Sequence, residues 1–232
     1  MKAVHWFLGI TAAFSMIIIL LISAFEVGIY SDFGWYEKEY EKYEVTKDLE
    51  MEMEDVMDVT EEMMAYLRGN REELTVWTTV DKVEQEFFNA REKAHMVDVK
   101  RMFLGGLKIR FGAIAVFVLS LIGIIAAKGN WKRILPKSFL LGIGVLFGFL
   151  GCLGVLIASD FNKYFILFHE IFFDNDLWLL DPATDLMIRM LPEGFFFDMV
   201  VRIGGIFVGA LAVLFVLSVI VLRRQKSNKK DL

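Results

Sequence analysis

Four long apolar runs limit what this chain can fold into more than any other feature of the sequence. They extend over roughly Trp6–Val27, Phe111–Ala127, Phe139–Ala158 and Met199–Leu222. A helix that crosses about 30 Å of hydrocarbon at about 1.5 Å per residue needs a run of this length. The first run is longer than the apolar part of a cleaved signal peptide, and no small-residue cleavage site follows it. The sequence therefore predicts an all-α polytopic membrane protein with four transmembrane helices.

The positions of lysine and arginine predict the orientation of these helices. The connector Lys128–Lys137 carries four basic residues and no acid, and the chain after Leu222 carries five basic residues and only Asp231 as an acid. Short basic segments beside transmembrane helices stay in the cytoplasm. With four crossings, both termini are then cytoplasmic, and the two other connecting regions are extracytoplasmic.

We therefore expect five parts along the chain. They are residues 1–29, the first transmembrane helix; 30–108, an extracytoplasmic loop domain; 109–158, the second and third helices with a cytoplasmic connector; 159–199, an extracytoplasmic interfacial platform; and 200–232, the fourth helix with a basic cytoplasmic tail. The glycine pairs Gly144/Gly148 and Gly205/Gly209 are expected to let the third and fourth helices approach closely.

The loop domain is expected to hold a long acidic helix, a short extended segment and a second helix. Apolar residues recur at intervals of three to four from Val45 to Leu67, and Gly69–Asn70 marks a stop. The β-branched Thr75–Val80 predicts a short extended segment. Asp81 with Glu84 resembles a capping box, so the second helix is predicted to begin there and to end before Gly105–Gly106.

That second helix carries the first residues suited to chemistry. Arg91, His95, Asp98 and Met102 are spaced so that they share one helix face. Asp98 can accept a hydrogen bond from His95, which would fix the tautomer of the ring and raise its basicity. A pair of this kind is usually surface decoration, but this one lies shortly before a transmembrane run.

The platform, residues 159–199, combines many aromatic residues with many charges. An Asp or Arg at the bilayer centre costs about 2.5–3.5 kcal/mol, so this segment does not cross the membrane. Its aromatic content disfavours a water-exposed loop, and an interfacial helical segment along the membrane surface satisfies both conditions. Ser159 or Asp160 is expected to cap its first helix, and Asp181–Pro182 to begin another that reaches Met190.

The first platform helix carries an aromatic stripe beside a histidine. Its members are Phe161, Phe165, Phe168 and Phe172, and His169 lies next to them. A lone histidine on such a stripe is usually a packed or interfacial residue. Together with His95, however, it places two of the 3 histidines at the outer membrane boundary, each near carboxylates.

Several chemistries are excluded or disfavoured. There is no G-x-S-x-G elbow, P-loop or H-E-x-x-H motif. The regions expected outside are acidic, whereas binding of nucleic acid needs basic residues that neutralise phosphates. A metal site on His95, His169 and an Asp is chemically possible, but no tight ligand spacing supports it, so no metal and no cofactor are expected. A transporter is disfavoured because the apolar runs contain almost no ionisable residues.

Two segments resemble a known family. The strings HMVDVKRMF (95–103) and FNKYFILFHEIFFDNDLWLLDPATDLMIRMLPEGFFFDM (161–199) are similar to signature segments of the bacterial lipoprotein intramolecular transacylase (Lit) family. The resemblance implies an acyltransferase of the bacterial cell membrane that acts on diacylglyceryl-modified lipoproteins. It would move the sn-2 acyl chain from the glyceryl group of the N-terminal cysteine to that cysteine's α-amine, giving a lyso-form lipoprotein. The partners implied are lipoprotein substrates and membrane lipids.

The implied reaction assigns roles to the candidate residues. Aminolysis of an ester needs a proton acceptor for the amine, a proton donor for the leaving alkoxide and stabilisation of the oxyanion. We expect His169 to be the principal base and acid, and His95, supported by Asp98, to be the second proton-handling or oxyanion-stabilising group. Supporting candidates are Lys100, Arg189 and Asp176. Candidates for holding acyl chains are Phe165, Phe168, Phe172 and Trp178, although interfacial anchoring explains them equally well.

A function of another class stays open at this point. A non-catalytic membrane sensor or assembly factor could use the acidic outer loop to bind a partner. Replacing His169 would then change partner binding or stability and leave lipid structure unchanged.

Overall fold

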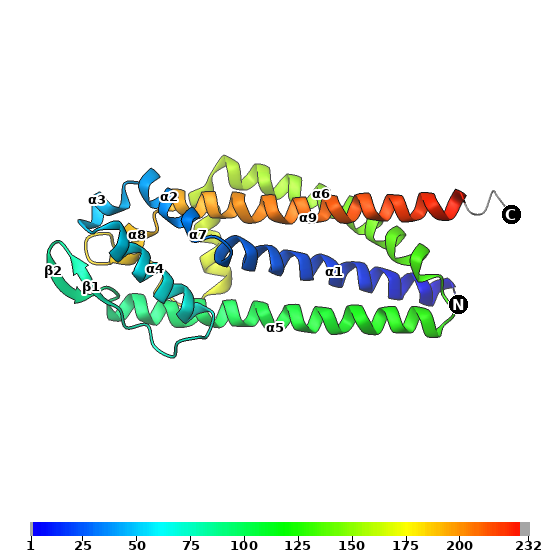
Figure 1. Ribbon diagram of the computed structural model, residues 1–232, viewed down its shortest axis with the longest axis horizontal. Helices are drawn as coiled ribbons and strands as arrows, with labels where there is room; N and C mark the ends of the chain where they lie inside the picture. The colour runs from blue at the N-terminus through cyan, green and yellow to red at the C-terminus, as the bar shows by residue number, and fades with distance from the viewer. Residues whose placement is uncertain (1, 228–232) are drawn as a thin grey trace. The chain divides into compact units, whose positions relative to one another are not determined.

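Four long helices dominate the computed structural model, which describes residues 2–227. They are α1 (Lys2–Tyr30), α5 (Ala90–Ala126), α6 (Trp131–Ser159) and α9 (Glu193–Ser227) (Figure 1). Each contains an apolar stretch long enough to cross a bilayer. The prediction of a helical protein that crosses the membrane four times is therefore confirmed. Lys229, Lys230 and Asp231 of the expected basic tail lie outside the described residues.

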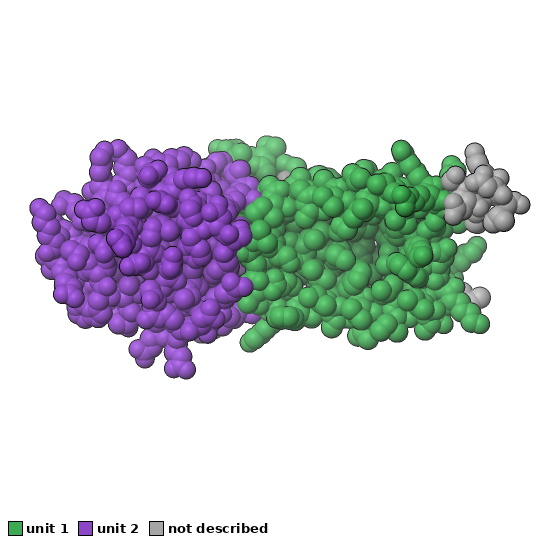
Figure 2. All heavy atoms as spheres, viewed as in Figure 1, with its two compact units in different colours: residues 1–27, 107–159, 203–232 green, residues 28–106, 160–202 purple. Residues whose placement is uncertain are grey.

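The chain divides into two compact units, which Figure 2 shows in different colours. Unit 1 consists of residues 1–27, 107–159 and 203–232, and unit 2 of residues 28–106 and 160–202. Unit 2 contains the shorter elements α2 (Gly34–Lys42), α3 (Val45–Leu49), α4 (Met53–Leu67), β1 (Trp77–Val80), β2 (Val83–Glu86), α7 (Phe161–Phe172) and α8 (Leu186–Met190). Two segments far apart in the sequence thus build one compact unit.

In unit 1, close helix packing occurs at other glycines than those predicted. Among the described residues, no atom of another helix lies within 4 Å of where a Cβ would be at Gly144, Gly148, Gly205 or Gly209, so the predicted close packing through these pairs is wrong. A Cβ at Gly9 of α1 would instead lie 2.5 Å from Ser138 Oγ of α6. One at Gly123 of α5 would lie 3.1 Å from the side chain of Leu8. Both of these close contacts involve α1, through its own Gly9 and through Gly123 of α5.

The predicted long acidic helix is two helices, α3 and α4. Glu50 adopts a left-handed conformation with φ 52°, and the N–H of Met51 returns to the carbonyl of Thr46 at 3.0 Å. The bend lets α3 pack against α2 and α8 and buries Leu49 almost completely. The predicted stop at Gly69 is confirmed, with φ 83° and the N–H of Asn70 bonded to the carbonyl of Ala65 at 2.9 Å.

The segment after Thr75 forms a β-hairpin, and this corrects the predicted start of the second helix. The extended segment is confirmed as β1, which pairs antiparallel with β2. Asp81 and Lys82 both have positive φ, 50° and 62°, as a two-residue hairpin turn of type I′ requires. Glu84 therefore lies opposite Thr79 in a strand and caps no helix. The helix begins at Ala90. It does not end before Gly105–Gly106, as predicted, but includes both glycines and continues to Ala126.

The core of unit 2 is largely aromatic. Tyr36 and Tyr40 of α2 pack against the ring of Phe195 and are fully buried. Their hydroxyls are satisfied, since Tyr36 donates to the carbonyl of Ile29 at 3.0 Å and Tyr40 bonds Thr60 Oγ1 at 2.7 Å. These bonds tie α2 to the end of α1 and to α4.

Candidate functional site

Helix α7 positions the first histidine of the site. The Asp160 carboxylate accepts a hydrogen bond from the N–H of Lys163 at 3.1 Å, which confirms Asp160 as the cap. The helix ends where the N–H of Phe173 bonds the carbonyl of His169 at 2.9 Å. His169 thus lies in the last turn of α7.

The ring of His169 lies in an aromatic cage and is only 7% exposed. Trp178 stacks on it at a centroid distance of 4.9 Å, and Phe165 meets it edge-on at 4.4 Å. Phe168 also contacts the imidazole, at 5.3 Å, whereas Phe172 contacts Phe168 and is 58% exposed. Of the four predicted lipid-binding residues, three therefore enclose His169.

The surroundings of His169 determine its tautomer. Its Nδ1 lies 2.7 Å from the carbonyl oxygen of Phe165, and a carbonyl only accepts. Nδ1 therefore carries the hydrogen, and the lone pair of the neutral ring is on Nε2. Burial lowers the pKa of His169 below its ordinary value, and the Phe165 hydrogen bond opposes this only in part.

The second histidine lies beside the first. His95, on α5, is 6% exposed, and its ring centroid is 6.1 Å from that of His169. Phe173 packs against both rings, at 5.3 and 5.5 Å. The Nδ1 atom of His95 is buried and has no hydrogen-bond partner among the described residues. The site therefore contains a polar atom whose bonding capacity is unused.

Asp98 acts on His95 through its charge and not through a hydrogen bond: burial lowers the pKa of His95 to about 4, and the Asp98 carboxylate opposes this shift. Its two carboxylate oxygens accept hydrogen bonds from Arg101 at 3.1 Å and from the amide of Asn175 at 2.9 Å. Within residues 2–227 no hydrogen bond joins it to His95. The carboxylate is satisfied by the segment after α7, so Asp98 fixes that segment and leaves the tautomer of His95 unset.

The three supporting candidates also have partners away from the histidine rings. Lys100 donates to the carbonyl of Arg71 at 2.6 Å and lies 3.9 Å over the ring of Tyr66. Arg189 pairs with Asp48 at 2.9 Å and joins α8 to α3. Asp176 contributes its backbone carbonyl, which accepts a hydrogen bond from the guanidinium of Arg91. Lys100 and Arg189 thus have partners for their charges, whereas Asp176 contacts Arg91 through its backbone.

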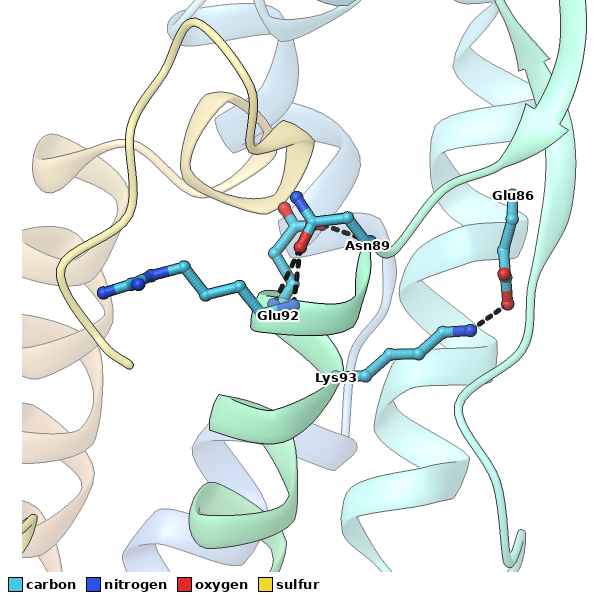
Figure 3. A network of polar contacts seen from close by, with 5 residues as sticks. Glu86, Asn89, Glu92 and Lys93 are labelled. Atoms are coloured by element: carbon cyan, nitrogen blue, oxygen red, sulfur yellow. Dashed lines mark hydrogen bonds and ion pairs between the residues drawn. The ribbon is translucent and has the colours of Figure 1, made fainter. Parts of the chain in front are cut away.

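A buried polar network at the start of α5 was missed by the sequence analysis. Asn89 Oδ1 accepts the N–H groups of Arg91 and Glu92 at 2.9 and 3.0 Å, and the Glu92 carboxylate accepts the N–H of Asn89 at 2.7 Å (Figure 3). This is a reciprocal capping box. Figure 3 also shows Lys93, one residue on, paired with Glu86 of β2. The N-x-x-E spacing at residues 89–92 was the signal that could have identified this cap.

The same network holds the segment that precedes α8. The second oxygen of Glu92, a fully buried residue, accepts the N–H of Met187 at 2.6 Å. The Asn89 amide donates to Asp185 Oδ1 at 2.6 Å. We call Asn89, Glu92 and Asp185 the clamp. It fixes the start of α5, which carries His95, to the segment that follows the α7 histidine.

The clamp also explains why the predicted helix from Asp181 to Met190 is wrong in its start. The Asp181 carboxylate accepts the N–H of Ala183 at 2.9 Å, and Asp185 accepts the N–H of Asp181 at 2.6 Å. These bonds close a turn, so the helix begins only at Leu186. Burial would raise the pKa of Asp185, but hydrogen bonds from Asp181, Asn89 and Thr184 hold it below its usual range.

The site can therefore exchange protons inside an apolar enclosure. It offers the lone pair of Nε2 on His169, a second imidazole next to it and aromatic side chains that leave both rings less than 10% exposed. No group of three His, Cys, Asp or Glu side chains suited to a metal ion occurs in the part of the chain that the structure describes.

Comparisons with known proteins agree with this arrangement. The solved structure of the membrane-integral lipoprotein intramolecular transacylase Lit from Bacillus cereus superposes with a TM-score of 0.76 at 19% identity, covering 98% of this chain and 100% of that one. A variant of that protein with one histidine replaced by arginine gives a TM-score of 0.75, also at 19% identity, over 98% of this chain and 96% of that one. These likenesses establish the fold.

Two sequence matches complete the comparison. An uncharacterized protein from Aquifex aeolicus is 34% identical over 131 residues, which are 55% of this chain and 52% of that protein. The match thus spans about half the length of that relative. Residues 10–196 match the family described as lipoprotein intramolecular transacylase Lit. Since this match includes both histidines and most of the chain, the protein belongs to the Lit family of acyltransferases.

Proposed function

We propose that this protein is a lipoprotein intramolecular transacylase that moves the sn-2 acyl chain of an S-diacylglyceryl N-terminal cysteine onto that cysteine's own α-amine. The observation that carries the proposal is the pairing of His95 with His169 at 6.1 Å in an aromatic enclosure. Family membership supports the class of reaction. The product is a lyso-form lipoprotein, and the acyl donor is the substrate itself.

The reaction needs only bond exchange and one net proton transfer. The amine nitrogen attacks the ester carbonyl carbon, a C–N bond forms, and the bond between that carbonyl carbon and the sn-2 oxygen of the glyceryl group breaks. The proton that leaves the nitrogen ends on the glyceryl oxygen. Because amine and ester belong to one molecule, orientation alone can contribute up to about 7–11 kcal/mol.

We assign the proton transfer to His169. Its Nε2 holds the free lone pair, because the Phe165 carbonyl occupies Nδ1. The lowered pKa keeps the ring neutral at pH values where the base must be unprotonated. A positioned histidine typically contributes about 10²–10⁴-fold to a rate. His169 would accept the amine proton and then return it to the leaving oxygen.

His95 is assigned the second role, proton relay or stabilisation of the oxyanion. Its ring is buried beside His169, and its Nδ1 has no protein partner in the described residues. A buried polar atom without a partner is costly, so a substrate atom that bonds it stabilises the complex. The clamp would act indirectly, by holding α5 and the α8 segment in register.

The acyl chains would lie on the exposed face of α7. Apolar side chains that are at least 37% exposed gather there: Ile166, Leu167, Phe168, Ile171 and Phe172. An amphipathic helix of this kind lies in the membrane interface with its apolar face in the acyl region. Phe168 touches both this face and the ring of His169, and so links the bound chain to the base.

We further propose that both termini are cytoplasmic and that the histidine site faces the extracytoplasmic side. The basic connector between α5 and α6 and the basic residues at the end of α9 support this orientation. Diacylglyceryl-modified lipoproteins would then reach the site at the extracytoplasmic surface of the membrane that the four helices cross.

The experiment is mass spectrometry of the N-terminal lipopeptide of a reporter lipoprotein, in a host that lacks its own N-acylating enzyme. Wild type is expected to shift one acyl chain to the α-amine, and His169→Ala to abolish the shift at equal protein level. His5→Ala, which alters the histidine of unit 1, serves as the matched control. An unmodified α-amine with well-expressed wild type would refute the proposal.

A further inference from the structure

A pocket of about 330 Å³ lies in unit 1, between the first two turns of α1 and the start of α6. Its polar and aromatic lining residues are Lys2, His5, Trp6, Asn130, Arg133 and Lys137. All of them belong to unit 1, and none belongs to the histidine site or to the clamp. The pocket is therefore a separate feature with its own chemistry.

The charge of this pocket is unbalanced. Lys2, Arg133 and Lys137 line it, and none of the three forms an ion pair in the described chain. The connector Lys128–Lys137 contains no acidic residue that could neutralise them. The N-terminus of α6 adds its positive dipole end. An anion is the ligand that this arrangement favours.

The walls of the pocket are fixed by packing. The His5 ring nitrogen Nε2 donates to the carbonyl of Ala127 at 3.0 Å, which ties the start of α1 to the end of α5. Gly9 lets α1 approach Ser138 and Ile134 of α6 without space for a side chain. The turns of α6 that carry Arg133 and Lys137 therefore lie opposite α1.

Trp6 indicates where the pocket lies in the membrane. This residue is 48% exposed at the polar end of a transmembrane helix. Tryptophan in such a position lies at the level of lipid headgroups, because its apolar ring can face the acyl chains while its N–H group contacts water or headgroups. A headgroup phosphate at this level would be next to the three cations.

We propose that this pocket binds the phosphate of an anionic phospholipid. Guanidinium groups bind phosphate oxygens in bidentate fashion, and basic pockets between transmembrane helices hold lipid headgroups. The volume of about 330 Å³ suits a headgroup and leaves no room for an acyl chain, which would remain in the bilayer. A free phosphate ion shares this chemistry, so the test includes it as a separate probe.

The test is native mass spectrometry of the detergent-solubilised full chain with phosphatidylglycerol, with phosphatidylcholine of the same acyl chains, and with inorganic phosphate. Wild type is expected to retain phosphatidylglycerol over phosphatidylcholine, and Arg133→Gln/Lys137→Gln to lose this retention by about tenfold or more. The control Lys128→Gln/Lys132→Gln removes the same charge from the same connector outside the pocket and should retain the lipid. Arg133→Lys keeps the charge but loses the bidentate geometry, so its retention should lie between those of wild type and the Arg133→Gln/Lys137→Gln variant.

Three results would overturn the proposal. Equal losses in both double variants would mean that diffuse surface charge, and not the pocket, attracts the lipid. Equal retention of the two phospholipids by wild type would exclude an anion site. Binding of inorganic phosphate without phosphatidylglycerol would assign the pocket to a free ion. Thermal unfolding shows that each variant is folded, and if the double variant is unfolded, Arg133→Gln alone must reduce retention.

Discussion

The contacts inside unit 1 differ in kind from the contacts inside unit 2. In unit 1, α1 packs closely on α5 and α6 through Gly123 and Gly9, and the Arg110–Glu26 pair at 2.8 Å adds a polar contact. In unit 2, buried side chains join segments far apart in the sequence, as Glu92 does with the backbone of Met187. Apolar packing suffices to build membrane helices, whereas placing two histidines together requires directional bonds.

The comparison predicts that replacing a histidine abolishes acyl transfer only when that histidine lies in unit 2. His169→Ala should lower the rate of acyl transfer by about 10²–10⁴-fold, because the ring supplies the proton acceptor. The rate would be measured on a synthetic diacylglyceryl peptide with purified protein. A rate within twofold of wild type would contradict the assignment, and so would an equal loss in the unit 1 control His5→Ala.

The clamp should govern stability as well as activity. Glu92→Ala leaves the buried N–H group of Met187 and the part-buried N–H group of Asn89 without their acceptor, so the free energy of unfolding should fall by about 1–3 kcal/mol. Denaturant unfolding in detergent measures this. The matched change Glu61→Ala, at an exposed position of α4, should leave stability nearly unchanged. Similar losses in both variants would disprove the role of the clamp.

In unit 1, the effect of adding a methyl group should depend on which glycine receives it. Gly9→Ala places a Cβ 2.5 Å from Ser138 Oγ, and such overpacking typically costs about 1–3 kcal/mol. Gly144→Ala, in the same bundle, meets no atom within 4 Å and should not destabilise it. Thermal unfolding of the two variants separates them, and a larger loss at Gly144 would contradict the packing described.

The smallest expected effect is a shift in titration. Burial lowers the pKa of His169, so its ring should stay neutral below the ordinary midpoint of about 6.5. Trp178→Ala exposes one face of the ring to water and should raise this pKa. With only 3 histidines in the chain, NMR of ¹⁵N-labelled imidazoles can follow each one. Titration of wild-type His169 above 6.5 would show that the enclosure is open.

The sequence was sufficient where local patterns decide structure. The four membrane helices follow from apolar length, the α7 cap from Asp160 and the end of α4 from Gly69. The β-hairpin was missed because its turn uses Asp81 and Lys82 in left-handed conformations, without the glycine that usually marks such a turn. Once the turn was mistaken for a cap, the true cap at Asn89 was missed too.

For the site, helical spacing predicted which residues share a face but not what they would meet. His95 and Asp98 lie on neighbouring turns, yet Asp98 accepts a hydrogen bond from Asn175, which lies in the segment after α7. Arg189 and Lys100 likewise found partners in α3 and in the loop after α4. These pairings depend on how two distant segments fold against each other, and short-range patterns carry no information about that.

The central claim is that one substrate molecule supplies both the acyl chain and the amine. The most direct measurement is a crossover experiment with purified protein, using equal amounts of an unlabelled diacylglyceryl peptide and a peptide that carries heavy amino acids and a deuterated sn-2 chain. The account predicts that mass spectrometry will find deuterated N-acyl groups only on heavy peptides and unlabelled N-acyl groups only on light peptides. With His169→Ala, neither N-acylated peptide should form. Deuterated chains on light peptides, or a chain taken from the sn-1 position, would contradict it.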